Sequence, residues 1–550
     1  MSENGGASAT PTPHIGRASV LMASGTIVSR VLGFVKAAVL ALTIGQVGSA
    51  AGDAFGAANQ LPNNIYALIA GGVLGAVLVP QIVRAGLHDD GGQRFINKLV
   101  TLGVTIFIGV TIVATLCAPL LIALYTQRSD GFTESGVALA TAFAYWCLPQ
   151  ILFYALYSLL GEVLNARNAF GPFTWAPVLN NVVAILGLVA FLLLFGGASE
   201  NSSPDVWTSE KIALLAGSAT LGIAAQALVL WAFWKRVGLT FRPDFQWRGV
   251  GLGRTGRTAG WVFAMILVTQ LAGIVQSRVA FLAAGEGAAV LALQNSWLIF
   301  MLPHSVIAVS IATAYFTRMS GHASNGRLTE LRADVSQSLR SIGMLMVFGA
   351  IALAVIAHPF ARFFETEFGN VQAMALVIIA FVVGLVPFSA VFVLQRVFYS
   401  LEDTRTPFFI EVIKSTLFVA GALACSILPT EWIGAGLALV TALVATAHFL
   451  ITFVWLRVRL GPLDGRLLLR RHLEYGLAAI PAGAAGFGLL VILGGLTDGG
   501  FAVASFLGAV ASIAVIGVAM AAVYFGVLAV FKHPELTPAL RPLLARLRRG

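Results

Sequence analysis

Fourteen apolar stretches, each of roughly 20 residues or more, follow one another along the 550-residue chain, and about 20 apolar residues are needed for one helix to cross a bilayer. Backbone N–H and C=O groups find no water partners in lipid, so only helices and closed barrels can span it. Runs this long and continuous exclude a barrel. The sequence therefore predicts an all-α polytopic membrane protein. The expected spans are centred on residues 20–45, 53–83, 99–125, 137–164, 175–196, 212–234, 261–284, 290–315, 339–361, 371–399, 407–428, 432–455, 473–493 and 501–531.

Composition excludes a soluble protein, because 58% of the residues are hydrophobic and only 11% are charged. Soluble domains have about 45–50% apolar and about 25% charged residues. The net charge of +10 would indicate nucleic acid in a soluble protein, but here it is the excess of Lys and Arg typical of cytoplasmic loops. No nucleic acid is expected. The three cysteines lie in apolar runs without metal-ligand spacing, so no metal site is expected.

The distribution of positive charge predicts the orientation of the chain. If the N-terminus is cytoplasmic, 27 of the 34 Lys and Arg residues lie in or beside cytoplasmic loops. External loops then contain 3, namely Arg128, Lys211 and Arg362. Positive residues are retained on the cytoplasmic side of membranes. Both termini are therefore expected in the cytoplasm, which requires an even number of spans.

The two halves of the chain repeat one another. The segment IVSRV around Arg30 returns as IVQSRV around Arg278, and polar segments at 165–168 and 402–407 precede the fifth and eleventh spans. Parallel repeats predict two six-helix lobes related by a pseudo-two-fold rotation, with the substrate site between them. The expected parts are a disordered cytoplasmic tail (1–16), an N-lobe (17–236), a cytoplasmic linker (237–257), a C-lobe (258–457), two further helices (458–531) and a basic cytoplasmic tail (532–550).

Charged residues inside the first two spans indicate a polar cavity. Arg30 and Lys36 interrupt the first apolar run, Asp53 opens the second, and Arg278 lies in the seventh. A charge at the bilayer centre costs about 2.5–3.5 kcal/mol on insertion scales, so such residues usually face a bundle interior or a watery cavity. For two of these residues an alternative to the cavity remains open. Arg30 could pair with Asp53 and fix the first two helices to each other. Lys36 could extend its side chain to the membrane interface.

The second span contains further features with two interpretations each. Asp53 is either a functional carboxylate or the N-cap of its own helix. A break is expected at residues 61–63 because of Pro62. Pro62, with Gly71 and Gly72, forms either a hinge or a site of close helix packing.

Short motifs occur along nearly the whole chain. They are 29–34 (SRVLGF), 53–55 (DAF), 61–63 (LPN), 164–168 (LNARN), 176–177 (AP), 398–400 (FYS), Asp403 and 406–407 (TP). In these motifs the chain resembles the lipid II flippase family, called MurJ or MviN, of the multidrug/oligosaccharidyl-lipid/polysaccharide exporter superfamily, and it looks like an actinobacterial branch of that family. The resemblance implies a transporter without catalytic residues. It would carry the undecaprenyl-pyrophosphate-linked peptidoglycan precursor to the outer leaflet of the bacterial plasma membrane.

The resemblance also implies a substrate site. Arg30, Lys36 and Arg278 would neutralise the pyrophosphate, for which the planar fork of arginine is suited. Asp53, from the motif DAF of the second span, and Tyr66 are also expected at the substrate site. Tyr66 stands where other members have an arginine. The last two helices would shelter the polyprenyl tail.

This sequence departs from other members at two more places. Ala37 replaces an acid after Lys36, and Trp297 and Leu298 stand where an Asp-Arg pair is usual.

The chain contains no P-loop, so no cofactor is expected and the drive would come from a coupling ion or the membrane potential. Anionic membrane lipids at the basic tail, Arg541 to Arg549, and cell-wall synthesis proteins are the other expected partners. The rival interpretations are a cation-coupled drug or polysaccharide-lipid exporter of the same superfamily, a non-transporting scaffold for cell-wall synthesis and a lipid-modifying enzyme.

Overall fold

The computed structural model describes residues 13–73, 90, 92–167, 169–246 and 256–536, and no β-strand occurs among them. The helices of the first half are α1 (Pro13–Ile44), α2 (Ala50–Val73), α4 (Gln93–Leu116), α5 (Ala118–Tyr125), α6 (Glu134–Cys147), α7 (Gln150–Ala166), α8 (Phe170–Phe195), α9 (Ala198–Asn201) and α10 (Ser209–Trp234). Those of the second half are α11 (Gly256–Ala280), α12 (Val290–Pro303), the π-helical η5 (His304–Ala308), α13 (Val309–Ser324), α14 (Leu328–Val355), α15 (Ala357–Ala361), α16 (Phe368–Val382), α17 (Leu385–Ser400), α18 (Arg405–Cys425) and α19 (Thr430–Leu460). The chain continues through α20 (Gly465–Ile492), α21 (Phe501–Ala504) and α22 (Phe506–Val530).

The predicted polytopic all-α fold is confirmed. In the described part of the chain, 12 helices are long and apolar enough to cross a membrane, or 13 if the bent pair α16 and α17 forms one span. The second expected span corresponds to α2, whose described part ends at Val73. Every expected span thus has a helical counterpart.

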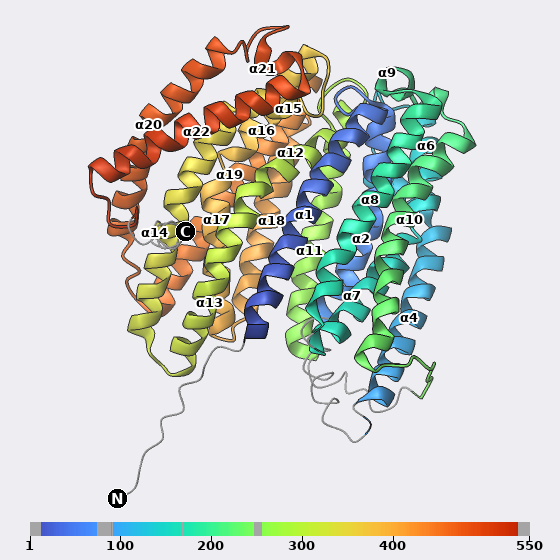
Figure 1. Cartoon of the computed structure of the whole chain (residues 1–550), viewed down its shortest axis with the longest axis horizontal. Helices are drawn as coiled ribbons and strands as arrows, with labels where there is room; N and C mark the ends of the chain where they lie inside the picture. Colours follow the sequence, from blue (N-terminus) through green and yellow to red (C-terminus); the bar gives the residue numbers. More distant parts are fainter. Residues whose placement is uncertain (1–12, 74–89, 91, 168, 247–255, 537–550) are drawn as a thin grey trace, which may run out of the picture.

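Two six-helix lobes share one packing order (Figure 1). In the N-lobe, α1 packs on α8, α8 on α10, α2 on α6 and α4 on α7. In the C-lobe, the corresponding pairs are α11 on α18, α18 on α19, α12 on α16 and α14 on α17. The sequence repeat is therefore a repeat of helix packing. The two additional helices α20 and α22 pack on each other, and α20 covers α14 on the outside of the C-lobe (Figure 1).

Helix α2 passes through Pro62 without a break, so the predicted interruption at residues 61–63 is wrong. Proline removes only one N–H from the backbone hydrogen bonds of this 24-residue helix. The other backbone groups of the buried helix still need partners inside the helix, so the helix continues on both sides of Pro62. A side-chain bond from Gln60 Nε2 to Asn64 Oδ1 (3.2 Å) also spans this turn.

The predicted tails and linker are described only in part. Residues 1–12, 247–255 and 537–550 lie outside the described residues, and with them most of the basic tail. Residues 13–16 belong to α1 and not to a disordered tail, because Pro13 suits the first position of a helix.

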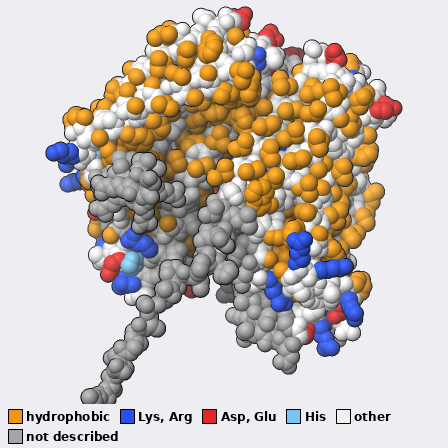
Figure 2. Space-filling view, viewed as in Figure 1, with side chains coloured by type: hydrophobic (Ala, Val, Ile, Leu, Met, Phe, Trp, Pro, Cys, Tyr) orange, Lys and Arg blue, Asp and Glu red, His pale blue; other side chains and the backbone are white. Residues whose placement is uncertain are grey.

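A broad hydrophobic surface covers most of the face seen in Figure 2, and Lys and Arg side chains gather toward one end of the bundle. This end holds the α13–α14 turn (Figure 1). The opposite end holds α9 and α21 (Figure 1).

Candidate functional site

The two lobes are joined at the end that holds α9, and we call this junction the seam. It consists of residues 45–53 and 129–131 from the N-lobe and of residues 281–295 and Glu365 from the C-lobe. The Gly48 N–H donates to the Gly287 carbonyl at 3.0 Å. A Cβ added to Gly285, whose φ is +78°, would lie 2.2 Å from the Gly131 carbonyl oxygen. The backbones are therefore in direct contact, and larger residues would force the lobes apart.

Asp53 joins the lobes across this seam. Its buried carboxylate accepts a hydrogen bond from the Leu291 N–H at 3.0 Å, in the first turn of α12. An acid at a helix N-terminus satisfies an otherwise unpaired N–H and favours the helix dipole. The cap of α2 itself is Ser49, whose Oγ accepts from the Gly52 N–H at 3.0 Å. Asp53 therefore caps a helix of the other lobe, and its interpretation as the cap of its own helix is wrong.

A second set of polar contacts lies beside Asp53. The Asn295 amide donates to Gln46 Oε1 at 2.6 Å, and the Val47 N–H donates to Glu365 Oε1 at 3.0 Å. Glu365 lies in the loop between α15 and α16. Burial raises the pKa of its carboxyl to about 7, although hydrogen bonds from Val47 and its neighbours oppose the shift. The seam thus contains a carboxyl that titrates near neutral pH.

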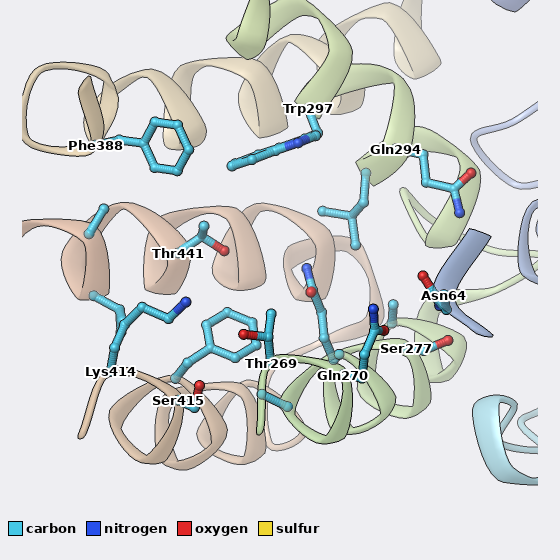
Figure 3. A pocket seen from close by; sticks show the side chains of 18 of the residues that line it. Asn64, Thr269, Gln270, Ser277, Gln294, Trp297, Phe388, Lys414, Ser415 and Thr441 are labelled. Carbon is cyan, nitrogen blue, oxygen red and sulfur yellow. The ribbon is translucent and has the colours of Figure 1, made fainter. Parts of the chain in front are cut away.

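A cavity of about 700 Å³ lies between α2 and the C-lobe helices α11, α12, α17, α18 and α19 (Figure 3). Its polar lining consists mainly of amides and hydroxyls. These residues are Gln60, Asn64, Tyr125, Thr269, Gln270, Gln276, Ser277, Gln294, Gln395, Ser415 and Thr441. None of these residues was singled out from the sequence as part of a site. The available signal was the helical spacing of Thr269, Gln270, Gln276 and Ser277 inside one apolar span.

Trp297 forms an aromatic wall of this cavity. Its ring packs at 4.8 Å from Phe300 and at 5.5 and 5.4 Å from Phe381 and Phe388, measured between centroids. Figure 3 shows the indole extending over the cavity beside Phe388. The position where the resemblance implied a charged pair therefore presents an aromatic face here.

One ion pair lies in the cavity lining. Lys414 Nζ is 2.5 Å from Glu411 Oε1, and the Thr269 hydroxyl donates to the same oxygen at 2.6 Å. His448 lines the cavity beside them. The two charges compensate each other, and none of the three predicted cations lines this cavity.

The three predicted cations lie around the cavity and not in it. The exposed Arg30 donates to the Ser305 hydroxyl in η5 of the C-lobe, so its predicted alternative as a partner of Asp53 is wrong. Lys36 is half-buried on α1, and the described structure gives it no hydrogen bond or ion pair. Arg278 donates to the Ala123 carbonyl at 3.0 Å, at the C-terminal end of α5, where a cation is favoured.

The other predicted site residues lie in α2. The Tyr66 ring is 6.3 Å from that of Phe107 and 5.9 Å from that of Tyr154, so it packs inside the N-lobe. Gly71 and Gly72 fall in the last described turn of α2. Their roles in binding or as a hinge stay predictions.

Comparison with known proteins gives the family. Residues 41–512 match the family model "Lipid II flippase MurJ". The probable lipid II flippase MurJ of Haemophilus influenzae is 28% identical over 453 residues, covering 77% of this chain and 82% of the relative. The corresponding protein of Vibrio cholerae is 26% identical, covering 72% and 75%.

Solved structures agree at the level of the fold. A structure described as lipid II flippase MurJ in an inward closed conformation matches with a TM-score of 0.70 and 18% identity, over 93% of this chain and 100% of that one. An inward-facing multidrug resistance MATE family transporter matches with a TM-score of 0.62 and 18% identity, over 81% and 99%. Since the family model matches most of the sequence, the chain belongs to the lipid II flippase MurJ family.

Proposed function

We propose that this chain is a flippase that moves lipid II from the inner to the outer leaflet of the bacterial plasma membrane by alternating access. The observation that carries the proposal is a cavity, lined by amides and hydroxyls among apolar side chains, between α2 and the C-lobe, where the junction of the lobes is sealed at one end. Family membership supplies the substrate class: a polyprenyl pyrophosphate that carries a sugar–peptide headgroup.

The chemistry of the cavity fits such a headgroup. Amide and hydroxyl side chains can donate to and accept from the hydroxyls and amides of sugars and peptides. The exposed face of Trp297 offers an apolar surface of the kind that covers a sugar ring. A cation-coupled exporter would instead need a carboxylate that is free to bind its cation. Glu411 already accepts from Lys414 and Thr269, so the cavity favours a neutral, hydrogen-bonding group.

We place both termini in the cytoplasm and the seam at the outer face. The split of 27 to 3 positive charges between the two sets of loops supports this orientation. The polyprenyl tail would remain in lipid along α20 and α22, outside the C-lobe. With no ATP-binding motif in the sequence, the drive is a coupling ion or the membrane potential, worth about 2.3 kcal/mol per charge and 100 mV.

Depletion in the parent bacterium tests the function. Cells that lose this protein are expected to lyse, to accumulate lipid-linked precursor and to keep it inaccessible to a lipid II-binding reagent added outside. Re-expression of the chain should restore all three readouts. Normal exposure of the precursor on the outer surface of depleted cells would overturn the proposal.

The seam is expected to open as pH rises, because Glu365 holds its proton more tightly there than in water. Its pKa is about 7 in the sealed state, against 4.5 for the free side chain. The stabilisation of the sealed state is therefore fully present below about pH 4.5 and is lost as pH rises through 7. One pKa unit corresponds to about 1.4 kcal/mol, so the ratio of sealed to open molecules should fall more than tenfold.

A thiol in the seam measures this change. Ser129 donates to the Phe281 carbonyl across the lobes at 3.0 Å, so Ser129→Cys places a probe there, after replacement of the three native cysteines by alanine. Labelling by an impermeant maleimide, corrected for the pH dependence of a free thiol, should increase from pH 5 to pH 8. In Glu365→Gln the corrected labelling should depend less steeply on pH, and an unchanged slope in that variant would contradict the assignment.

A further inference from the structure

Arg396 is a cation without a counter-ion in the last turn of α17. Its guanidinium carbon lies 4.4 Å from the ring centroid of Phe392 and 5.3 Å from that of Phe316 on α13. Its Nε is buried without a hydrogen-bond partner, and the described residues give its guanidinium no hydrogen bond or ion pair. Aromatic faces hold this side chain in place without neutralising it.

Carboxylates of the same lobe are committed to other cations. Asp334 Oδ1 lies 2.6 Å from Arg318 Nη2, Asp403 pairs with Arg459, and Glu411 pairs with Lys414. A half-buried charge without a partner is costly, and stacking on rings offsets only about 0.5–2 kcal/mol of that cost. An arginine left in this condition is typical of a site that receives its anion from a ligand.

Arg396 lies just beyond the cavity lining on α17. Phe388, Phe392 and Gln395 line the cavity, and Arg396 is one residue beyond Gln395 and four beyond Phe392. Helix α16 begins three residues after Glu365 of the seam, and α17 continues from it to Ser400, so Arg396 lies toward the end of the cavity away from the seam. The cavity is therefore followed by a cation toward the cytoplasmic side.

Arg30 approaches the same pair of rings from the other lobe. Its guanidinium contacts Ser305, the adjacent His304 ring is 5.3 Å from the ring of Phe392, and the guanidinium of Arg396 lies over that Phe392 ring. Arg30 and Arg396 thus flank one cluster of rings, one cation from each lobe. Planar guanidinium groups bind phosphate oxygens in a bidentate manner.

We propose that Arg396 is the C-lobe ligand of the pyrophosphate of the lipid-linked substrate, opposite Arg30 and below the headgroup cavity. The inference rests on the proposed flippase function and adds the location of its anion subsite. The chemical class that it takes is a pyrophosphoryl group, either on a polyprenyl lipid or free in solution.

Lipid binding to the purified full-length protein in nanodiscs tests this site. The probes are undecaprenyl pyrophosphate, the neutral alcohol undecaprenol and inorganic pyrophosphate, with affinities measured for wild type, R396Q and R396K. Loss of a charged hydrogen-bond partner typically costs about 1.5–3 kcal/mol, so R396Q should bind the pyrophosphate lipid roughly tenfold to a hundredfold more weakly. R396K should be intermediate, and binding of the alcohol should not change.

Arg405 provides the matched control. It also lies over aromatic rings, 5.9 Å from Trp261 and 5.6 Å from Phe409, but it does not continue the cavity face. R405Q should bind all three probes as wild type does. Tighter binding of the pyrophosphate lipid than of inorganic pyrophosphate identifies the lipid as the ligand, and equal binding would overturn the lipid assignment.

Two outcomes separate this inference from the function on which it rests. If wild type prefers the pyrophosphate lipid over the alcohol and R396Q keeps that preference, the Arg396 site is wrong and the flippase proposal stands. If wild type itself shows no preference between them, the flippase proposal fails as well. An equal loss of lipid and alcohol binding in R396Q would reveal a structural role and overturn the site. Should R396Q fail to fold, full wild-type affinity of R396K for the pyrophosphate lipid would overturn the bidentate contact.

Discussion

Arg30→Ala is expected to abolish complementation of a depleted strain while the protein still accumulates in the membrane. Arg30 is exposed in the middle of an apolar helix, where it donates a hydrogen bond to Ser305 of the other lobe and, among the described residues, to no other side chain. A charge at this depth costs about 2.5–3.5 kcal/mol and is retained where a site needs it. Its loss as a phosphate ligand should weaken substrate binding by about 1.5–3 kcal/mol, or roughly tenfold to a hundredfold.

Ser305→Ala is the control that separates binding from structure. It removes the hydroxyl that Arg30 contacts but leaves the charge, so it should complement nearly normally. Arg30→Lys should be partly defective, because an ammonium cannot make the bidentate contact. If Ser305→Ala is as defective as Arg30→Ala, the arginine serves only to join the lobes, and its substrate role is refuted.

The fold could be predicted from the sequence because its determinants are local. Whether a stretch can span a bilayer depends on about 20 consecutive residues, and fourteen such stretches leave one class of architecture. The repeat of the motif around Arg30 at Arg278 predicted two lobes, and the packing of α1 on α8 is repeated by α11 on α18. The break predicted at Pro62 does not occur, because a single missing N–H does not interrupt the helix.

The site could be predicted only in part because its partners are not local. Asp53 was singled out from the sequence, but its partner is a backbone N–H of α12, which no sequence pattern encodes. Arg278 resembles a cavity cation in sequence, yet carbonyls at the end of α5 hold it. Arg396 falls within a few residues of a predicted cytoplasmic loop, so its charge was counted with the loops.

The cavity lining shows the same limit. Amides such as Gln276 and Gln294 have ordinary roles between membrane helices, where they hydrogen-bond to neighbours. They form a site only once α11, α12, α18 and α19 surround one space. A pattern of charges reveals that a membrane protein has a polar interior, but the uncharged groups that give specificity become visible only after the helices are packed.

Asp53→Ala is expected to open the seam and to abolish transport. The carboxyl group caps α12, and its removal leaves the buried Leu291 N–H without this partner, at a typical cost of about 1–3 kcal/mol. Asp53 joins the two lobes, so its loss should shift the ratio of sealed to open molecules by roughly fivefold to a hundredfold toward the open state. Asp53→Asn keeps an acceptor and should have a smaller effect. The thiol probe at Ser129→Cys measures the opening as faster labelling from outside the cell.

Ser49→Ala separates the junction of the lobes from the stability of one helix. Ser49 caps α2 in the same way, with its Oγ on the Gly52 N–H, but within the N-lobe. Its loss should cost about 1 kcal/mol of protein stability and leave the labelling rate at the seam nearly unchanged. If Ser49→Ala and Asp53→Ala accelerate labelling equally, the effect is a general loosening of the seam. Asp53 would then have no specific role in holding the two lobes together.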